Sequence, residues 1–78
     1  MATKPQHLSV YRPVPVFLRM MREKAGLTQR QLAAKIGKTQ SWIQKSEIGS
    51  RRVDVAEFML FCHGCGVDPS EAIRRLGR

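Results

Sequence analysis

The sequence predicts an all-α fold, a compact domain of five short helices, and three observations lead to this prediction. Apolar residues recur at helical spacing, helix caps punctuate the chain at short intervals, and no segment shows the sustained alternation of a well-marked strand. The 78 residues form at most one small domain. A domain of this size buries only about 60% of its unfolded surface, which disfavours a deep cavity for substrate chemistry.

The N-terminal segment differs in composition from the rest of the chain. Residues 1–13 are mostly polar and contain two prolines, and we expect them to form a flexible N-terminal arm, with residues 14–78 as the folded domain. Leu8, Val10 and Arg12 alternate with their neighbours, which is a weak strand signal. This segment lacks the order of a signal peptide, and no apolar run approaches the roughly 20 residues of a membrane span, so we expect a cytoplasmic protein.

The first helix is expected to begin near Val14, where Pro13 and Pro15 favour a helix start, and to end before Gly26. An apolar stripe with helical spacing runs along it, formed by Val14, Phe17, Leu18, Met21 and Ala25. This stripe predicts the buried face of the helix.

Two helices are predicted to follow in close succession. Thr28 and Gln31 have the spacing of a capping box, which predicts a second helix that ends at Gly37. The inner face of this helix is expected to consist of Leu32, Ala33 and Ile36. Thr39 is the expected cap of a third helix that runs to about Glu47.

The last third of the chain predicts two more helices. Asp54 and Glu57 indicate the start of the fourth, and Gly64 and Gly66 its end. Its apolar stripe is expected to be Val55, Phe58, Met59 and Cys62. Residues 68–71 then supply a cap, a proline at the first helical position and an acid in the first turn. The inner face of this fifth helix is expected to be Ala72, Ile73 and Leu76.

The charge balance favours a nucleic-acid partner. Fourteen Lys and Arg residues against six Asp and Glu residues give a formal net charge of +8 at pH 7. So much positive charge on one small domain is typical of nucleic-acid binders. The alternatives are a basic protein without such a partner and a protein that touches acidic membranes.

The two cysteines, Cys62 and Cys65, have C-x-x-C spacing. A structural zinc site needs four ligands, and the other usual donors in the chain are only His7 and His63. A c-type haem site would need histidine where Gly66 stands. We therefore expect both cysteines to be core residues in a reducing compartment, with no metal site and no cofactor.

Residues 29–48 carry the functional signal, because two short helices joined at Gly37 make a helix-turn-helix. Ala33 is small where the second helix must approach the third closely. Gly37 tolerates the positive φ that the turn requires. Ile43 is expected to face back toward the second helix and to hold the crossing angle.

Over residues 17–76 the chain resembles the lambda-repressor-like, or Xre/Cro-type, helix-turn-helix family. The resembling segments are Leu18-Arg19, Ala25-Gly26-Leu27-Thr28-Gln29, Leu32-Ala33, Ile36-Gly37, Thr39-Gln40-Ser41-Trp42-Ile43-Gln44-Lys45, Glu47-x-Gly49-x-Arg51-Arg52 and Gly66-Val67-Asp68-Pro69. The resemblance implies a five-helix domain that binds operator DNA, usually as a dimer; repressors of this family are standard examples of helix-turn-helix docking.

Three positions depart from the family pattern. Ser46 stands where an apolar residue is usual, which predicts looser packing of the third helix. Ile48 replaces a residue that is often polar or basic, which would remove one phosphate contact. Cys65 stands where leucine is common, which supports a core position for the C-x-x-C pair.

Four residues of the third helix are the candidates for reading bases. A recognition helix presents its N-terminal residues to the major groove while apolar residues behind it hold the docking angle. The residues that lie opposite Ile43 are Gln40, Ser41, Gln44 and Lys45. Glutamine is suited to adenine and lysine to guanine. The alternative is an ordinary solvated helix face.

The candidates for contacting phosphates are Gln29, Lys38, Trp42, Arg51 and Arg52. Gln29 resembles the family residue that binds a phosphate at a helix N-terminus and supports Gln40. Two placements are predicted for Trp42. Either its ring packs against the DNA backbone or a thymine methyl, or it is half-buried against the fourth helix. Arg51 has a rival assignment as the ion-pair partner of Glu47. The remaining arginines considered, which we expect to solvate the far surface, are Arg19, Arg22, Arg74 and Arg75.

These observations predict a sequence-specific transcriptional regulator of the repressor type, bound to a double-stranded DNA operator. No catalytic arrangement is placed by the sequence, so an enzyme is not expected. One rival is an antitoxin that uses the same domain and a toxin partner, and another is a protein-interaction module. We also expect a weak homodimer, formed through Ile73 and Leu76 with help from Val10 or Tyr11.

Overall fold

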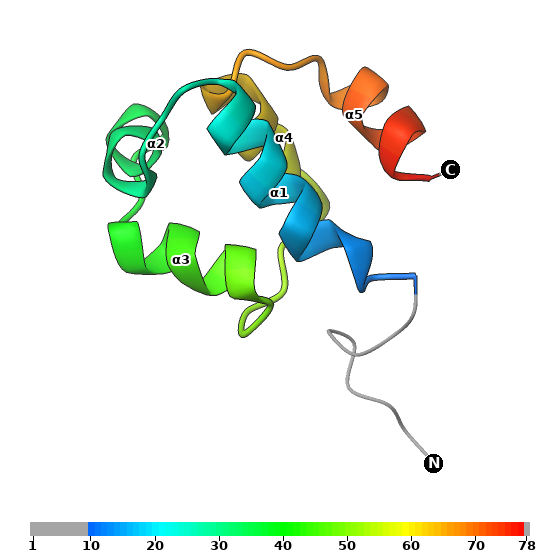
Figure 1. The fold of residues 1–78 in the computed structure, drawn as a ribbon, viewed down its shortest axis with the longest axis horizontal. Coiled ribbons are helices and arrows are strands. Elements are labelled where there is room, and N and C mark those ends of the chain that lie inside the picture. Colours follow the sequence, from blue (N-terminus) through cyan, green and yellow to red (C-terminus); the bar gives the residue numbers. More distant parts are fainter. Residues whose placement is uncertain (1–9, 78) are drawn as a thin grey trace.

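The structure, a computed structural model, describes residues 10–77, and these residues form five helices and no strand (Figure 1). The helices are α1 (Pro13–Lys24), α2 (Gln29–Ile36), α3 (Gln40–Ile48), α4 (Val55–Gly64) and α5 (Pro69–Leu76). The predicted all-α class is confirmed. None of these helices is long and apolar enough to cross a membrane.

Four of the five helices, α2 to α5, begin at the predicted caps. In the capping box of α2, the Thr28 hydroxyl accepts from the Gln31 backbone N–H at 3.0 Å, and the Gln31 side chain accepts from the Thr28 N–H at 2.9 Å. Asp54 and Glu57 form a second capping box at α4. Thr39 caps α3, and α5 begins in the same way with Asp68 before Pro69.

The turn between α2 and α3 depends on Gly37. This glycine ends α2 in the left-handed region, with a φ of 69°. A residue with a side chain would be strained in this backbone conformation. Its N–H donates to the Ala33 carbonyl and thereby closes the last turn of α2. The predicted helix-turn-helix therefore forms with its glycine in the expected role.

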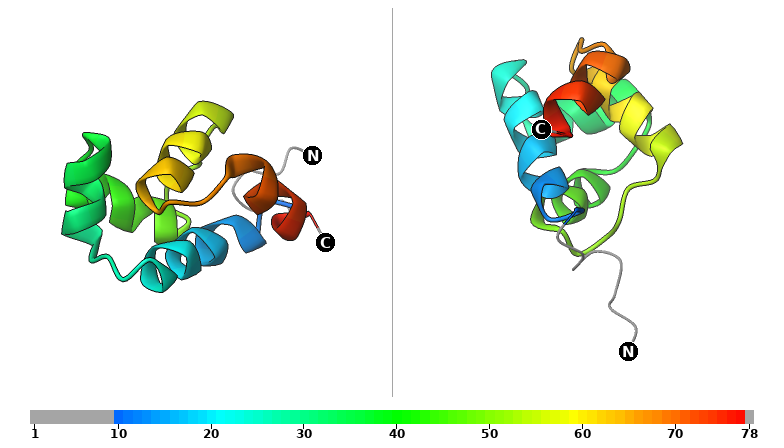
Figure 2. Two further views of the ribbon diagram at one scale, coloured as in Figure 1. Left: turned by 90° about the horizontal axis from the view of Figure 1, so that it is seen from above. Right: turned by 90° about the vertical axis from the view of Figure 1, so that its right-hand side faces the viewer.

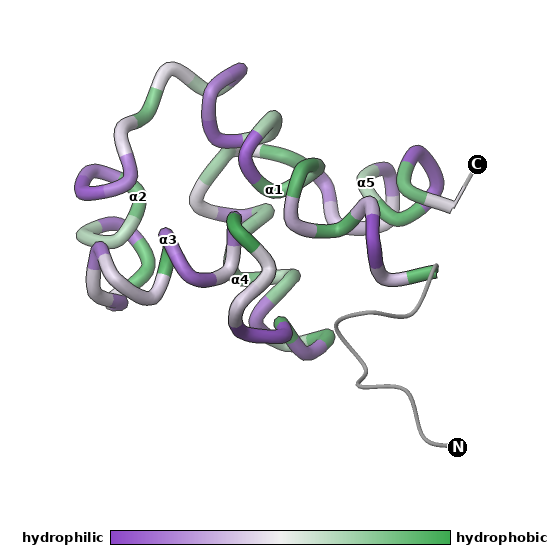
Figure 3. Tube along the Cα trace, turned by 60° about the horizontal axis from the view of Figure 1, so that its bottom comes forward, coloured by the Kyte–Doolittle hydropathy of each residue, from purple (hydrophilic) through white to green (hydrophobic). Residues whose placement is uncertain are grey.

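One core joins all five helices. Hydrophobic and hydrophilic residues are interspersed along the chain (Figure 3), and every helix contributes at least one buried apolar residue to the core. The buried apolar residues are Leu18, Met21, Leu32, Ala33, Ile43, Phe58, Phe61, Cys62 and Ala72. Helix α3 packs on α1 and α2, whereas α5 packs on α4 and α1. As a result α2 and α3 lie at one end of the long axis and α5 lies at the other (Figures 1 and 2).

The predicted stripe of α4 is wrong in part. Val55 is 77% exposed and Met59 43% exposed, whereas Phe61, which was not in the stripe, is fully buried. Every residue from Phe58 to Cys62 is apolar, so periodicity alone cannot fix the rotation of this helix. Only the packing partners decide which side faces inward.

Two other expectations also need correction. Ala25 follows the end of α1 and is exposed, so it does not extend the buried stripe. Ile73 is 55% exposed, and only Ala72 and Leu76 of the expected inner face of α5 pack on the core. Helix α4 ends at Gly64, as predicted. A Cβ at Gly64 would lie 2.5 Å from Leu32 Cδ1, so this glycine also permits close contact between α4 and α2.

The described part of the N-terminal segment is joined to the domain. Residues 10–12 form a turn before α1, which begins at Pro13, and they are not a strand. The hydroxyl of Tyr11 accepts a hydrogen bond of 2.8 Å from the Val53 backbone N–H in the loop between α3 and α4. The rest of the predicted arm, with Leu8, lies outside the described residues, and the flexibility of residues 1–13 stays a prediction.

Candidate nucleic-acid interface

Helix α3 turns one polar side outward. Ile43 is fully buried and fixes the rotation of the helix, as predicted from its position. The side chains that this rotation leaves exposed include all four candidate base readers, Gln40, Ser41, Gln44 and Lys45. We call these four residues the α3 face. It is a continuous polar surface on a short, well-capped helix.

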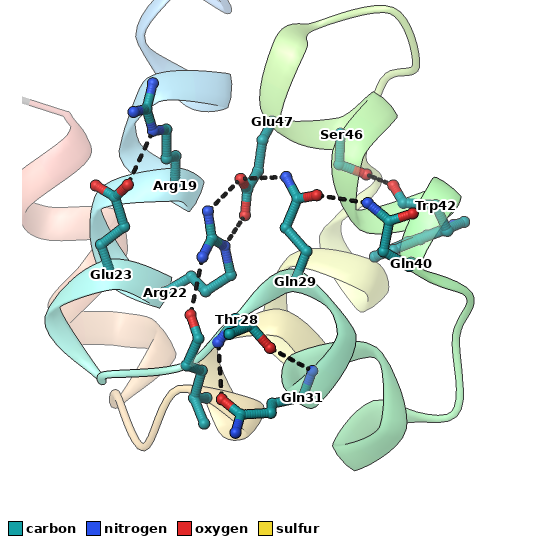
Figure 4. Close-up of polar contacts among 11 residues, drawn as sticks. Arg19, Arg22, Glu23, Thr28, Gln29, Gln31, Gln40, Trp42, Ser46 and Glu47 are labelled. Carbon is teal, nitrogen blue, oxygen red and sulfur yellow. Dashed lines mark hydrogen bonds and ion pairs between the residues drawn. The ribbon is translucent and has the colours of Figure 1, made fainter.

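The first residue of the α3 face is held by a neighbouring glutamine. The Gln40 side-chain amide donates to the Gln29 side-chain oxygen at 2.7 Å (Figure 4). Gln29 is the first residue of α2, so this bond ties the start of α3 to the start of α2. The contact expected between these two residues is present.

A buried ion pair lies behind Gln29. The Arg22 guanidinium of α1 makes two bonds to the Glu47 carboxylate of α3, with Nε–Oε2 at 2.6 Å and Nη2–Oε1 at 2.9 Å. A third nitrogen of Arg22 donates to the Leu27 carbonyl at 2.8 Å. The Gln29 amide nitrogen donates to the same carboxylate at 3.1 Å, so three helices meet at Glu47 (Figure 4).

The expectation that Arg22 solvates the far surface is wrong. Its side chain is 11% exposed, and that of Glu47 is 2% exposed. The hydrogen bond to Glu47 is the largest influence on the pKa of Arg22 and raises it, so the guanidinium stays charged despite its burial. Residues 22 and 47 are 25 positions apart. The only signal in the sequence was the four-residue spacing between Ile43 and Glu47, which puts both on the buried side of α3.

A second cluster surrounds the indole of Trp42. Lys38 Nζ lies 5.1 Å and Arg51 Cζ 4.7 Å from the centre of the ring. The ring itself is half-buried, with its centroid 6.5 Å from that of Phe61 in α4. Of the two placements considered for Trp42, packing against the fourth helix is therefore present, and the indole carries two cations beside α3.

Arg51 is not the partner of Glu47. Its guanidinium contacts the Glu57 carboxylate instead, at 3.0 Å and 3.4 Å, because Glu47 is already occupied by Arg22. The hydrogen bond from Arg51 is the largest influence on the pKa of Glu57, which is lowered. Arg52, the next residue, is exposed.

The two departures from the family pattern on α3 have different outcomes. Ser46 is fully buried, and its hydroxyl donates to the Trp42 carbonyl at 2.8 Å, so the polar group is satisfied inside the core. The expected looser packing of α3 is not seen at this position. Ile48 is 67% exposed and offers no polar group at the end of the helix.

Positive charge remains available around α3. Among residues 10–77, the two buried or half-buried carboxylates nearby, Glu47 and Glu57, are each engaged by an arginine. Lys38, Lys45 and Arg52 take part in none of the ion pairs formed within this range. Cations that pair with no carboxylate among the described residues, next to an exposed polar helix, suit a polyanion such as a nucleic acid.

The cysteines belong to the core. Cys62 is fully buried with its sulfur 3.9 Å from that of Met21, and Cys65 is half-buried. Burial is the main reason that the pKa of each thiol is raised to about 11, which keeps both protonated at neutral pH. Within the described residues, no group of three or more His, Cys, Asp or Glu side chains is arranged to hold a metal ion.

The five-helix fold and the exposed α3 define the class of the protein, a helix-turn-helix domain. The family model described as "Helix-turn-helix domain" matches residues 16–75. In fold and sequence the chain is similar to an XRE-family like protein from Pseudomonas syringae pv. tomato str. DC3000. The two are 43% identical with a TM-score of 0.82, over 87% of this chain and 83% of that one.

A second solved structure shares the fold. It is the clp gene regulator ClgR from C. glutamicum, 20% identical, with a TM-score of 0.78 over 90% of this chain and 91% of that one. No curated protein matches the sequence significantly. The family model and the 43% identical XRE-family like protein each match most of the chain. The chain therefore belongs to the Xre-type helix-turn-helix family of DNA-binding transcription regulators.

Proposed function

We propose that the protein is a sequence-specific regulator of the repressor type, which reads double-stranded operator DNA by placing α3 in the major groove. The observation that carries this proposal is the α3 face, in which Gln40 is held in place by Gln29 while its amide stays exposed. Preorganised side chains lose less conformational freedom on binding and therefore discriminate better between bases.

The roles of the α3 face follow from its chemistry. Gln40 and Gln44 suit adenine, which offers N7 as acceptor and N6 as donor, and Lys45 suits the acceptors of guanine. Ser41 can donate or accept and so contacts either kind of base. All four residues come from the first two turns of α3, which is the part of a recognition helix that meets base edges.

The phosphate contacts would flank this face. Gln29 lies at the N-terminus of α2, where backbone N–H groups and the helix dipole favour an anion. Lys38 and Arg51 are held on the Trp42 indole, which supports them with its ring. Arg52 is exposed next to them. Such contacts fix the register of the protein on the duplex without reading sequence.

A weak homodimer would double the readout. An apolar groove of about 520 Å³, which we call the α4–α5 groove, is lined by Tyr11, Val14, Val53, Asp54, Val55, Phe58, Met59, Pro69, Ser70, Ile73 and Leu76. Three of these apolar side chains, Val55, Met59 and Ile73, are largely exposed in the single chain. The proposed occupant is a second copy, since one domain reads too few base pairs to find a site in a genome.

Selection from a randomised duplex pool tests the function. The full chain is expected to enrich a palindromic sequence, with half-sites spaced about one helical turn apart. Binding that shows no sequence enrichment and no dependence on salt would contradict the proposal. The antitoxin alternative predicts the same enriched site together with a toxin that co-purifies with the protein.

A further inference from the structure

The hydrogen bonds behind Gln40 have only one permitted direction. The Glu47 carboxylate is buried and can only accept, so Gln29 must turn its amide nitrogen toward it, as observed at 3.1 Å. The oxygen of Gln29 then faces Gln40 and accepts from the Gln40 nitrogen at 2.7 Å. A charge inside the domain thus sets the orientation of an exposed amide.

The carboxylate itself is anchored from α1. Two nitrogens of Arg22 hold both oxygens of Glu47, and the third nitrogen is bonded to the Leu27 carbonyl. Bidentate arginine–carboxylate pairs fix geometry as well as charge. Glu47 therefore has no freedom to release Gln29 without leaving the Arg22 guanidinium buried and unpaired.

The orientation decides what Gln40 offers to a base. One N–H of Gln40 is used by Gln29, which leaves one N–H donor and the amide oxygen as acceptor. This pair complements adenine, which presents N7 and N6–H₂, whereas guanine presents the two acceptors N7 and O6.

We propose that Arg22 and Glu47 are positioning residues that make Gln40 select adenine over guanine. They act through Gln29 and touch no base themselves. This inference rests on the proposed function, in which Gln40 reads bases. Without the buried carboxylate, the terminal torsions of both glutamines have two comparable orientations, and Gln40 presents its nitrogen to the groove as readily as its oxygen.

The test uses a double variant, Arg22→Met with Glu47→Met. Replacing both members of a buried ion pair by apolar residues of similar size is often neutral for stability, so we expect this variant to fold. Wild type and variant are each put through selection on the randomised duplex pool. The wild type should prefer adenine over guanine by about tenfold at one position per half-site, and the double variant should lose this preference.

The hydrogen bonds that lead from Arg22 and Glu47 through Gln29 to Gln40 form what we call the relay. Gln29→Met is the second variant, because it interrupts the relay while leaving the Arg22–Glu47 pair intact. It should lose the same preference, and it decides the question even if the double variant does not fold. Arg52→Ala is the matched control, since it weakens binding without touching the relay, and it should keep the ratio of adenine to guanine. A purely structural role of the buried pair would lower the melting temperature and leave this ratio unchanged.

The selection experiments can overturn the inference in several ways. A folded double variant that keeps the adenine preference removes Arg22 and Glu47 from specificity, and a Gln29→Met protein that keeps it removes the relay. If Gln40→Ala leaves the selected site unchanged, Gln40 does not read bases, and that part of the proposed function fails together with the inference. Loss of the preference in Gln40→Ala but not in the relay variants overturns the inference alone.

Discussion

The α3 face and the α4–α5 groove are both exposed, but they are built in opposite ways. The α3 face is polar, and its first residue is held by hydrogen bonds that lead to a buried ion pair. The α4–α5 groove is apolar, and its side chains Val55, Met59 and Ile73 are exposed without comparable polar anchoring. Polar preorganisation suits the recognition of a particular sequence, and exposed apolar area suits association.

The largest effect is expected where the α3 face is anchored. Arg22→Ala leaves the Glu47 carboxylate buried without a cation, so the free energy of unfolding should fall by about 3–5 kcal/mol, as measured by urea denaturation. Arg19→Ala is the control, because its pair with Glu23 is exposed and its loss should cost less than about 1 kcal/mol. Equal losses in the two variants would show that the buried Arg22–Glu47 pair is no stronger an anchor than an exposed ion pair.

A smaller effect is expected at the surface of the α3 face. Gln40→Ala should weaken binding to the selected site by about 1–3 kcal/mol and relax specificity at one position per half-site. Its unfolding transition should hardly change, because the Gln40 side chain is exposed. Unchanged affinity, measured by titration of a labelled duplex, would remove Gln40 from the set of base readers.

Arg52→Ala separates the phosphate contacts from the reading residues. Because Arg52 is exposed beside α3 and free of the ion pairs found in residues 10–77, its loss should weaken specific and random DNA about equally. The slope of log affinity against log salt should become less steep by about one. A loss confined to the selected sequence would instead make Arg52 a base reader.

The smallest effect on the single domain is expected at the α4–α5 groove. Ile73→Asp should change the free energy of unfolding by no more than about 0.5 kcal/mol, because the residue is more than half exposed. It should nevertheless reduce cooperative occupancy of a palindrome, while binding to one half-site stays intact. Sedimentation of the free protein, with titration of full and half sites, measures both quantities. Cooperativity that survives the substitution places the dimer contact elsewhere.

The local signals in the sequence were sufficient for the helices but not for their rotation. Caps at Thr28, Thr39, Asp54 and Asp68 act through hydrogen bonds within three residues, so the sequence shows both partners at once. In α4, by contrast, the apolar residues surround the helix, and the prediction selected Met59 where the structure buries Phe61. The apolar pattern of α4 therefore does not indicate which side of the helix faces the core.

In the candidate site, likewise, the exposed side of α3 could be predicted from the sequence, whereas the ion pairs of the arginines could not. Apart from the neighbouring Trp42, Ile43 is the only apolar residue in the middle of α3, so it identified the outward side of this helix and with it the four candidate readers. The rival pairing of Arg51 with Glu47 and the solvated position expected for Arg22 were both wrong. Charges attract at any sequence separation, and only proximity along the chain had suggested Glu47 for Arg51. Sequence distance says little about which arginine reaches a buried carboxylate.

The sequence alone was enough for the features that depend on neighbouring residues: five helices, four of which have side-chain caps, the glycine turn at Gly37 and the polar side of α3. The contacts between helices could be found only once the helices were packed together. These include the Arg22–Glu47–Gln29–Gln40 relay and the stacking of Arg51 on Trp42. The reason is physical, since a cap is completed within one turn of chain, whereas a buried carboxylate takes its partner from whichever helix the core brings beside it.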